Sequence, residues 1–515
     1  MKNIFFCITL ALGCTLTTYA QFSLNGQVRT RTEIRNGLGN LLPIDSKSAA
    51  FTSQRTRLSF GYKMERVNFG IVAQDVRVWG QDASTISNAD GNKLMIHEGW
   101  ADITLANAKD STLKFKAMES ISLKIGRQEL NYDDVRLLGN LDWLQQARRF
   151  DMALLKTLHK GFQLDLGYAF NQNSDGFNIA GTQYLPGNIP VYVKDNKGIL
   201  VPTPAGIVPL AAGGNLTNNS TKNGTPIYTN PPSTNAANQD YKSFFMIYAS
   251  KKVKNTKISA LFFNDHFGKS RLDSVSTITG GYVYGKRFDV IGTNSRTTFG
   301  AMLNQAFGKD IKVGQIAIQA AFYKQSGKDR DGLELSASHF MANAFYTKNK
   351  WTGGLGYEFL SGNDANTPVG QNNRFDPLYG TPHRHWGYMD YFYVGTGATS
   401  GGLSNLYAKA KYTAKDFYLM LDIHSFATAS TIRKSDGTDL SKGLGTEIDF
   451  IANYTLNRIT NLEFGYSVMK ATDSMSIAKG QNQALKYNNN ATWAYLMINI
   501  RPDFLYKAPE IKKNK

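Results

Sequence analysis

Cysteine is nearly absent from this sequence of 515 residues, because its two cysteines, Cys7 and Cys14, both lie near the N-terminus. Downstream of them no residue can form a disulfide, a thiolate metal site or a cysteine nucleophile. Long apolar runs are also missing, and the run at residues 4–12 is far shorter than the ~20 residues of a membrane-spanning helix. A Gly-x-Ser-x-Gly motif and a nucleotide-binding fingerprint are absent too, which argues against a hydrolase or a nucleotide-driven enzyme.

The short N-terminal apolar run instead predicts an export signal. Lys2 is the one charged residue in the first 20, and the sequence Thr-Tyr-Ala at residues 18–20 has the small-x-small form of a cleavage site. We therefore expect a signal peptide at residues 1–20, cleaved between Ala20 and Gln21. A lipoprotein anchor at Cys14 is the alternative interpretation.

Most of the chain alternates between apolar and polar residues, which is the period of a β-strand. Residues 162–171, for example, place Phe, Leu, Leu, Tyr and Phe at every second position, with mostly polar or small residues between them. A strand with one face toward lipid and the other toward water explains this pattern in an exported protein. The fold class predicted is an all-β transmembrane antiparallel barrel of about eighteen strands. The predicted strand centres are Val28, Leu58, Ile71, Ile103, Leu123, Ala153, Leu166, Ile247, Leu261, Met302, Ile318, Met341, Leu355, Ala408, Leu421, Ile448, Phe464 and Leu496.

The connections between these segments alternate in length. Short turns such as 159–161 and 413–415 follow long connections such as 361–402, which is the layout of short periplasmic turns and long extracellular loops. The barrel is expected to occupy residues 21–505, followed by a basic tail at 506–515. Residues 172–240 form one long extracellular loop, rich in Asn, Gly, Pro, Thr and Ser, which we expect to bury little and to be mobile. A loss of alternation near Asp75 and Arg77 predicts a bulge.

Arginines follow the polar face of the early strands. Arg29 and Arg31 share a face of the first strand, Arg55 and Arg57 share a face of the second, and Arg149 and Asp151 share a face of the sixth. The net charge of +18 favours an anionic partner, because a cationic surface attracts anions. We interpret these side chains as a cationic lining of the pore, with acidic neighbours that keep solute residence short. The alternative is that they are ordinary solvated lumen residues, balanced by acidic residues such as Glu33 and Glu98.

One stretch of sequence resembles a known family. Residues 123–139 read Leu-Lys-Ile-Gly-Arg-Gln-Glu-Leu-Asn-Tyr-Asp-Asp-Val-Arg-Leu-Leu-Gly, and Trp143 and Arg-Arg-Phe-Asp at 148–151 follow. These residues resemble the signature of the alginate-export family of outer-membrane proteins. Gln-Arg-Thr-Arg-Leu at 54–58 and the block Gly-Thr-Pro-His-Arg-His-Trp-Gly-Tyr-Met-Asp-Tyr-Phe at 380–392 resemble further blocks of that family.

The resemblance implies an eighteen-stranded barrel with an electropositive constriction that passes an acidic polysaccharide. It implies that this constriction is lined by Arg55, Arg57, Arg127, Arg136 and Arg149. Strict alternation puts Arg127 on the lipid side, so its inward position requires a bulge or an inward loop. The function predicted is an outer-membrane channel for an anionic solute, such as an alginate-like saccharide. A general anion-selective porin and a surface adhesin that uses the long loop are the alternatives.

The expected partners follow from this function. They are the anionic solute, outer-membrane lipid and lipopolysaccharide, and an export partner in the periplasm, while nucleic acid is not expected for an exported chain. No cofactor motif is found, and no Ser, His and acidic residue are placed together by alternation, so we do not expect an enzyme. His383 and His385 have the spacing of a metal-binding pair, but no cluster of carboxylates accompanies them, so a loop packed into the lumen is the preferred interpretation.

Overall fold

A computed structural model gives the structure of the protein. It describes residues 21–80, 94–110, 115, 117–172, 189–211, 225–227, 241–393, 399–434 and 436–506. The predicted signal peptide at residues 1–20 lies outside the described residues, as does most of the predicted basic tail. Among the described residues, no helix has both the length and the apolar character required to cross a membrane.

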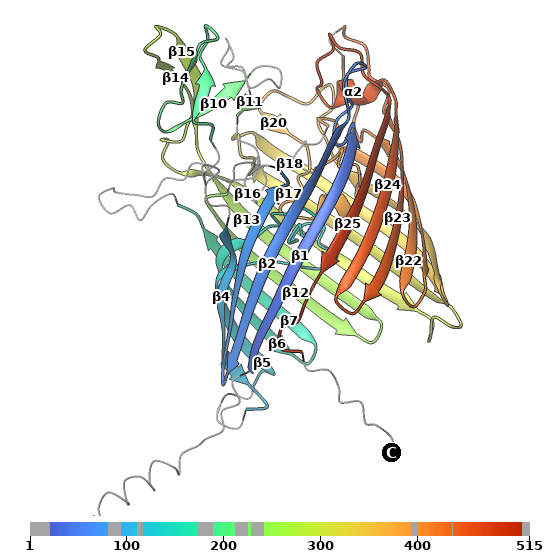
Figure 1. The fold of residues 1–515 in the computed structure, drawn as a ribbon. Helices are drawn as coiled ribbons and strands as arrows, with labels where there is room; N and C mark the ends of the chain where they lie inside the picture. Colours follow the sequence, from blue (N-terminus) through green and yellow to red (C-terminus); the bar gives the residue numbers. More distant parts are fainter. Residues whose placement is uncertain are drawn as a thin grey trace, which may run out of the picture.

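Eighteen antiparallel strands form one closed barrel, in which the first strand pairs with the last (Figure 1). Each of the eighteen predicted centres falls inside one of these strands, so the predicted fold class is confirmed. The strands are β1 (Gln21–Asn36), β2 (Ala49–Met64), β3 (Val67–Val78), β4 (Met95–Asn107), β5 (Ser120–Gln128), β6 (Phe150–His159), β7 (Phe162–Phe170), β12 (Ser243–Val253), β13 (Thr256–Gly268), β16 (Thr293–Phe307), β17 (Gln315–Lys328), β18 (Glu334–Lys348), β19 (Trp351–Leu360), β21 (Leu403–Thr413), β22 (Phe417–Ala427), β23 (Gly443–Asn457), β24 (Thr460–Ala471) and β25 (Asn490–Ile500).

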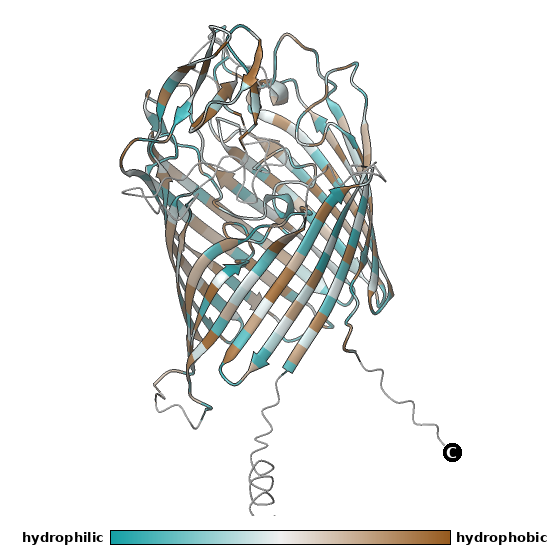
Figure 2. Cartoon of the chain, turned by 60° about the vertical axis from the view of Figure 1, so that its left-hand side comes forward, coloured by the Kyte–Doolittle hydropathy of each residue, from teal (hydrophilic) through white to brown (hydrophobic). Residues whose placement is uncertain are grey.

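The two faces of the barrel wall differ as the alternation predicts. On β22, Leu421 and Ile423 are 42% and 39% exposed on the outer face, whereas Asp422 and His424, on the inner face, are buried. Figure 2 shows the same exchange of hydrophobic and hydrophilic residues along neighbouring strands. Apolar residues outward and polar residues inward are the arrangement of a barrel in lipid.

One bulge lies close to the position where the sequence loses its alternation. The pairing of β3 with β4 shifts between Val72 and Ala73, which pair with Glu98 and Ile96, so His97 is an extra residue in β4. The bulge is thus on β4 rather than near Asp75 and Arg77, and it turns the buried side chain of His97 inward. An extra residue that redirects a side chain is the usual effect of a β-bulge.

The two ends of the barrel differ in their connections. Short turns close one end, called here the turn end, and longer segments lie at the other, called the loop end (Figure 1). At the loop end, β10 (Ile207–Ala211), β11 (Thr225–Pro226), β14 (Arg271–Ser276) and β15 (Tyr282–Arg287) form a small sheet, and β8 (Tyr192–Lys194) pairs with β9 (Leu200–Pro202).

These small sheets correct the expectation that the loop 172–240 buries little. In its described part, Val193, Val201 and Ile227 are buried together with Val283, which belongs to β15 of the following connection. The composition suggested a polar, mobile loop because each apolar segment is too short to bury itself. Strand β10 of this loop pairs with β15 of the following connection, and the apolar side chains of both loops are buried together.

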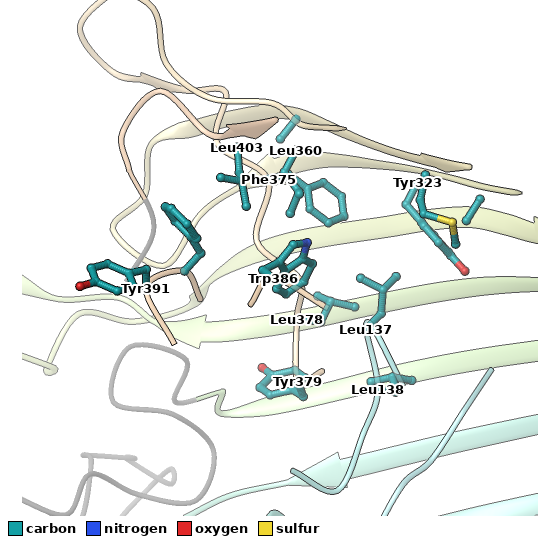
Figure 3. Packing of buried hydrophobic residues seen from close by; sticks show 14 of the residues in the cluster. Leu137, Leu138, Tyr323, Leu360, Phe375, Leu378, Tyr379, Trp386, Tyr391 and Leu403 are labelled. Carbon is teal, nitrogen blue, oxygen red and sulfur yellow. The ribbon is translucent and has the colours of Figure 1, made fainter. Parts of the chain in front are cut away.

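Two connections fold into the barrel and fill much of its interior. The first inward loop, residues 129–149, joins β5 to β6, and the second, residues 361–393, follows β19 and contains β20 (Gln371–Asn372) and the short helix η1 (Pro382–Arg384). Figure 3 shows how Leu137 of the first loop and Phe375, Tyr379 and Trp386 of the second pack with wall residues such as Leu403. The apolar core of the molecule therefore lies inside the barrel, between these loops and the inner wall.

The two inward loops also pair with each other through backbone hydrogen bonds. The amide of Tyr379 donates to the carbonyl of Leu137 at 2.9 Å, and the amide of Gly139 donates to the carbonyl of Tyr379 at 3.0 Å. The amide of Thr381 donates to the carbonyl of Val135 at 2.8 Å. The loops thus form one body inside the barrel.

Candidate functional site: the arginine cluster and the lumen cavities

Three arginines meet on the inner wall of the first two strands. Arg29 of β1 and Arg55 of β2 are register partners, and Arg57 is two residues further along β2, on the same face. Their side chains are only 4%, 1% and 13% exposed. The structure therefore brings together three of the arginines that the sequence placed on the lumen side, and we refer to Arg29, Arg55 and Arg57 as the arginine cluster.

The first inward loop faces this cluster and covers most of it. The carboxylate of Asp142 lies 2.8 Å from Arg55, 3.2 Å from Arg57 and 3.4 Å from Arg29. Arg29 also donates to the carbonyl oxygens of Asp142 at 2.8 Å and Leu144 at 3.1 Å. The sequence predicted free cations along the pore. These three arginines are not free, because each guanidinium already binds the first inward loop.

Side chains of the wall complete the coordination of the cluster. Arg55 donates to Gln27 Oε1 at 2.8 Å, and Arg57 donates to Gln74 Oε1 at 2.6 Å. Burial by itself would raise the pKa of Asp142, but the charges of Arg55 and Arg29 outweigh it, so the pKa lies below its ordinary value. Asp142 is therefore an anion at neutral pH, as a partner of three cations must be.

Arg31 lies two residues after Arg29, on the same face of β1, and has a separate set of contacts. It donates to Glu33 Oε1 at 2.8 Å and to the carbonyl of Trp143 at 2.8 Å, and its guanidinium lies 4.3 Å from the centre of the Trp143 ring. Trp143 also stacks on His383 of the second inward loop at 4.3 Å. Arg31 thus contacts the first inward loop where it meets the second loop and the wall. Its charge is balanced by Glu33, one of the acidic residues that the alternative interpretation of the sequence named.

Arg136 lies within the first inward loop and is an anchor. It is 5% exposed, it donates to Glu358 of β19 at 2.5 Å, and it forms an ion pair with Asp134 at 3.1 Å. Glu358 is also 2.6 Å from His339 of β18. Burial would raise the pKa of Asp134, but Arg136 beside it outweighs this and lowers the pKa to about 2.

Arg127 and Asp151 do not line the lumen, so this part of the predicted site is wrong. They are register partners on β5 and β6, and they form an ion pair at 2.8 Å with side chains 39% and 52% exposed. Both stand on the outer face, opposite to inward neighbours such as Gln128 and Met152, which are buried. The alternation of β5 continues through Arg127 without the bulge that an inward position requires.

Arg149 is partly buried, and its electrostatic neighbours are the same Arg127 and Asp151. It directly precedes β6, and it also interacts electrostatically with His97, which lies 3.1 Å from Arg57. Neither of the cavities described below includes Arg149 among its lining residues. The geometry therefore gives no support to Arg149 as a contact for a solute.

The outer-face pair leads to a first prediction. Replacing Arg127 by alanine should change the free energy of unfolding by no more than about 1 kcal/mol, because exposed ion pairs contribute little. It should also leave the ion selectivity of the barrel unchanged. Urea unfolding in detergent and the reversal potential in a planar bilayer measure the two effects. A clear loss of selectivity would show that Arg127 faces the lumen after all.

Among the described residues, two large cavities lie between the inward loops and the wall, beside a smaller one of about 100 Å³ near Arg296 and Asp376. The first has a volume of about 770 Å³ and extends from residues near the turn end, such as Asn457 and Asn461, to Asp142 and Trp143 of the first inward loop. The second has a volume of about 550 Å³. It is lined by the wall residues Lys257, Asn304, Gln319, Asn343, Tyr407 and Lys409, together with residues of both inward loops such as Asp134 and His385.

Arg384 is the residue that sequence reasoning missed. With Tyr388 it lines both cavities, and its side chain is exposed. Within the described residues its guanidinium forms no ion pair and no hydrogen bond, in contrast to the arginine cluster. The block at 380–392 resembles a family motif and contains this arginine between two histidines, but strand alternation does not predict which way a side chain in a loop points.

The two histidines beside Arg384 have partners within the loops. His383 Nδ1 is 2.6 Å from Asp390, and His385 Nε2 is 3.0 Å from the carbonyl of Asp134. Burial lowers the pKa of His385 to about 3, and Arg136 adds to this effect. Its neutral imidazole therefore donates to that carbonyl. Across the described residues no group of three or more His, Cys, Asp and Glu side chains is arranged to hold a metal ion. The loop packs into the lumen, as preferred from the sequence.

Comparison with known proteins agrees with this architecture. The family model for alginate export matches residues 13–169. This confirms the resemblance for the part of the chain that holds β1–β7 and the first inward loop. No curated protein matches the sequence.

Solved structures extend the likeness to almost the whole chain. OccAB4 of Acinetobacter baumannii has a TM-score of 0.54 at 11% identity, covering 94% of this chain and 98% of its own. OpdK of Pseudomonas aeruginosa, solved with vanillate, has a TM-score of 0.52 at 10% identity, covering 94% and 99%. A BenF-like porin from Pseudomonas fluorescens Pf-5 has a TM-score of 0.53 at 10% identity, covering 94% and 99%. At these identities the likeness establishes the fold. The protein is a β-barrel of the bacterial outer membrane, with the same overall fold as these structures.

Proposed function

We propose that the protein is an outer-membrane channel for an anionic solute, and that an acidic oligosaccharide or polysaccharide is the class of solute it passes. The observation that carries the proposal is the position of Arg384. Its unpaired, exposed guanidinium stands in the wall that the two cavities share. A rigid, permanently charged fork at that position can bind a carboxylate through two hydrogen bonds.

The surroundings of Arg384 support an anionic and hydroxylated solute. Lys257 and Lys409 add positive charge to the second cavity, and each is held by one acidic partner, Asp133 at 3.0 Å and Asp422 at 2.6 Å. Amide side chains such as Asn304 and Gln319 line the same cavity and offer both donors and acceptors for hydroxyl groups. The resemblance to alginate exporters and the vanillate in the related fold both favour a carboxylate.

The test is ion selectivity with and without this guanidinium. The refolded mature chain in a planar bilayer under a salt gradient should prefer anions, and Arg384→Ala should lower the ratio of anion to cation permeability. Arg384→Lys should retain most of it. Arg433→Ala is the matched control, because Arg433 lies in the connection between β22 and β23 and lines neither cavity.

The outcomes separate the candidate functions. An alginate oligomer that blocks the current of the unmodified channel, but not that of Arg384→Ala, would support a saccharide channel. Equal block by acetate and the oligomer would favour the general anion porin. Cation preference in the unmodified channel, or selectivity unaffected by Arg384→Ala, would contradict the proposal.

A further inference from the structure

We propose that Asp142 is an internal carboxylate that occupies an anion-binding site formed by Arg29, Arg55 and Arg57, and that the carboxylate of an entering solute displaces it. The proposal rests on the proposed function and adds to it a rearrangement of the first inward loop inside the lumen. The ligand class is a carboxylate, and the site is the arginine cluster itself.

The first support is the composition of the cluster. Three guanidinium groups converge on the one carboxylate of Asp142, at 2.8, 3.2 and 3.4 Å. The next acidic group, Glu129, is 3.9 Å from Arg57 and is shared with His97. The cluster therefore carries more positive charge than Asp142 neutralises, and a carboxylate bound here gains charge-assisted hydrogen bonds.

The second support is access. The side chain of Asp142 is 34% exposed, whereas those of Arg29 and Arg55 are 4% and 1% exposed. Asp142, Arg29 and Trp143 all line the first cavity, which also contains Arg384. A solute carboxylate held near Arg384 thus shares a cavity with Asp142 and Arg29, whereas Arg55 and Arg57 are not among the residues that line it.

The third support is the backbone of the first inward loop. Asp133, Val135, Leu141 and Ala147 all have positive φ angles, of 50°, 61°, 51° and 53°. Non-glycine residues adopt this region at a cost, a β-branched residue such as Val135 above all. Such a conformation persists because surrounding contacts enforce it. Leu141 is adjacent to Asp142, so loss of the Asp142 contacts removes a restraint at a strained position.

The remaining loop contacts limit how far the movement goes. Arg31 donates to the carbonyl of Trp143 at 2.8 Å, and Arg29 donates to that of Leu144 at 3.1 Å. These bonds do not involve a carboxylate, so the exchange leaves them in place. The displacement is therefore local to residues 140–142, at the inner end of the first cavity.

Asp142→Asn tests the exchange, because it keeps the size of the side chain and removes its charge. Galacturonate is the probe, and its affinity is measured from block of the current through the refolded mature chain. Without the competing carboxylate, the apparent affinity for galacturonate should rise by about fivefold or more, within the usual range of coupling between sites. Asp142→Glu should behave like the unmodified channel.

Glu463→Gln is the matched control. Glu463 lines the same cavity, and it accepts hydrogen bonds from Tyr418, Asn453 and Tyr495 instead of from the arginine cluster. The Glu463→Gln variant removes one negative charge from the same cavity, as Asp142→Asn does. It therefore measures how far the loss of a negative charge alone raises the affinity for galacturonate. Equal gains in affinity for Asp142→Asn and Glu463→Gln would overturn the exchange. Anion selectivity that still depends on Arg384 would then leave the proposed function standing.

A second measurement serves if Asp142→Asn does not refold. Because residues 21–515 contain no cysteine, a spin label at Asn140→Cys, in the segment that moves and in the lining of the first cavity, reports on the loop alone. Galacturonate should change the label's spectrum, and glucose, which has no carboxylate, should not. A spectrum that responds to neither sugar in a channel that galacturonate still blocks would contradict the displacement.

Discussion

Replacing Arg136 by alanine should lower the free energy of unfolding by about 3–5 kcal/mol, the usual effect of breaking a buried ion pair by removing one partner. Arg136 is 5% exposed and Glu358 is fully buried, so the substitution leaves a carboxylate in the interior without its cation. His339, at 2.6 Å, is the other group close enough to compensate. A pore-lining arginine in water would have a far smaller effect, so the experiment separates the anchor from the predicted constriction.

The variant should be measured by urea unfolding in detergent, with tryptophan fluorescence as the signal. The double variant Arg136→Met with Glu358→Gln should recover part of the loss, because Glu358 no longer becomes a buried unpaired charge, although Asp134 still loses its partner. Arg136→Ala should also increase current noise, since this pair ties the first inward loop to β19 and β18. A change in stability below about 1 kcal/mol, the range of exposed pairs, would show that Arg136 is solvated.

The barrel itself could be predicted because its signal is local. Outward residues such as Leu421 and inward residues such as Asp422 alternate along each strand, and neighbouring strands are joined in order along the chain. The same local rule was right for Arg127, where the family resemblance was wrong. Strand alternation predicts which face of the barrel wall a side chain points to. A resemblance to a family motif indicates only that the same residue type stands at the matching position of the motif.

The sequence favoured a loop packed into the lumen at residues 380–392, but the contacts of the inward loops could not be predicted because the partners lie far apart in the chain. Arg29 binds a loop residue 113 positions away, and Arg136 binds Glu358 at a separation of 222 positions. Nothing near Asp142 in the sequence distinguishes a carboxylate that faces arginines from one that faces solvent. The sequence thus identified the cations of the inner wall, but not that the chain supplies its own anion to them, nor that Arg384 is exposed between two cavities.

Gly380→Ala should separate the two inward loops and open the lumen. A Cβ atom at Gly380 would lie 1.9 Å from the carbonyl oxygen of Arg136, which is far inside van der Waals contact. The obstacle is backbone, so no rotamer change relieves it. The backbone pairs of Tyr379 and Thr381 with the first loop flank this point, and Arg148 donates to the carbonyl of Gly380 at 2.5 Å. All of these contacts have to shift together.

We expect Gly380→Ala to cost about 3 kcal/mol, at the upper end for an overpacked site, and to raise the conductance of single channels. The barrel should still form, because the pairing of its eighteen strands does not pass through Gly380. Gly443→Ala is the matched control, since a Cβ atom there would meet nothing within 4 Å. Unfolding in urea and single-channel recordings measure the two effects. A different result is that Gly380→Ala loses stability but conducts no better than Gly443→Ala. The loops would then have shifted without opening a path through the lumen. In that case the wall contacts of Arg136 and Asp142, and not the pairing between the loops, keep the loops in place.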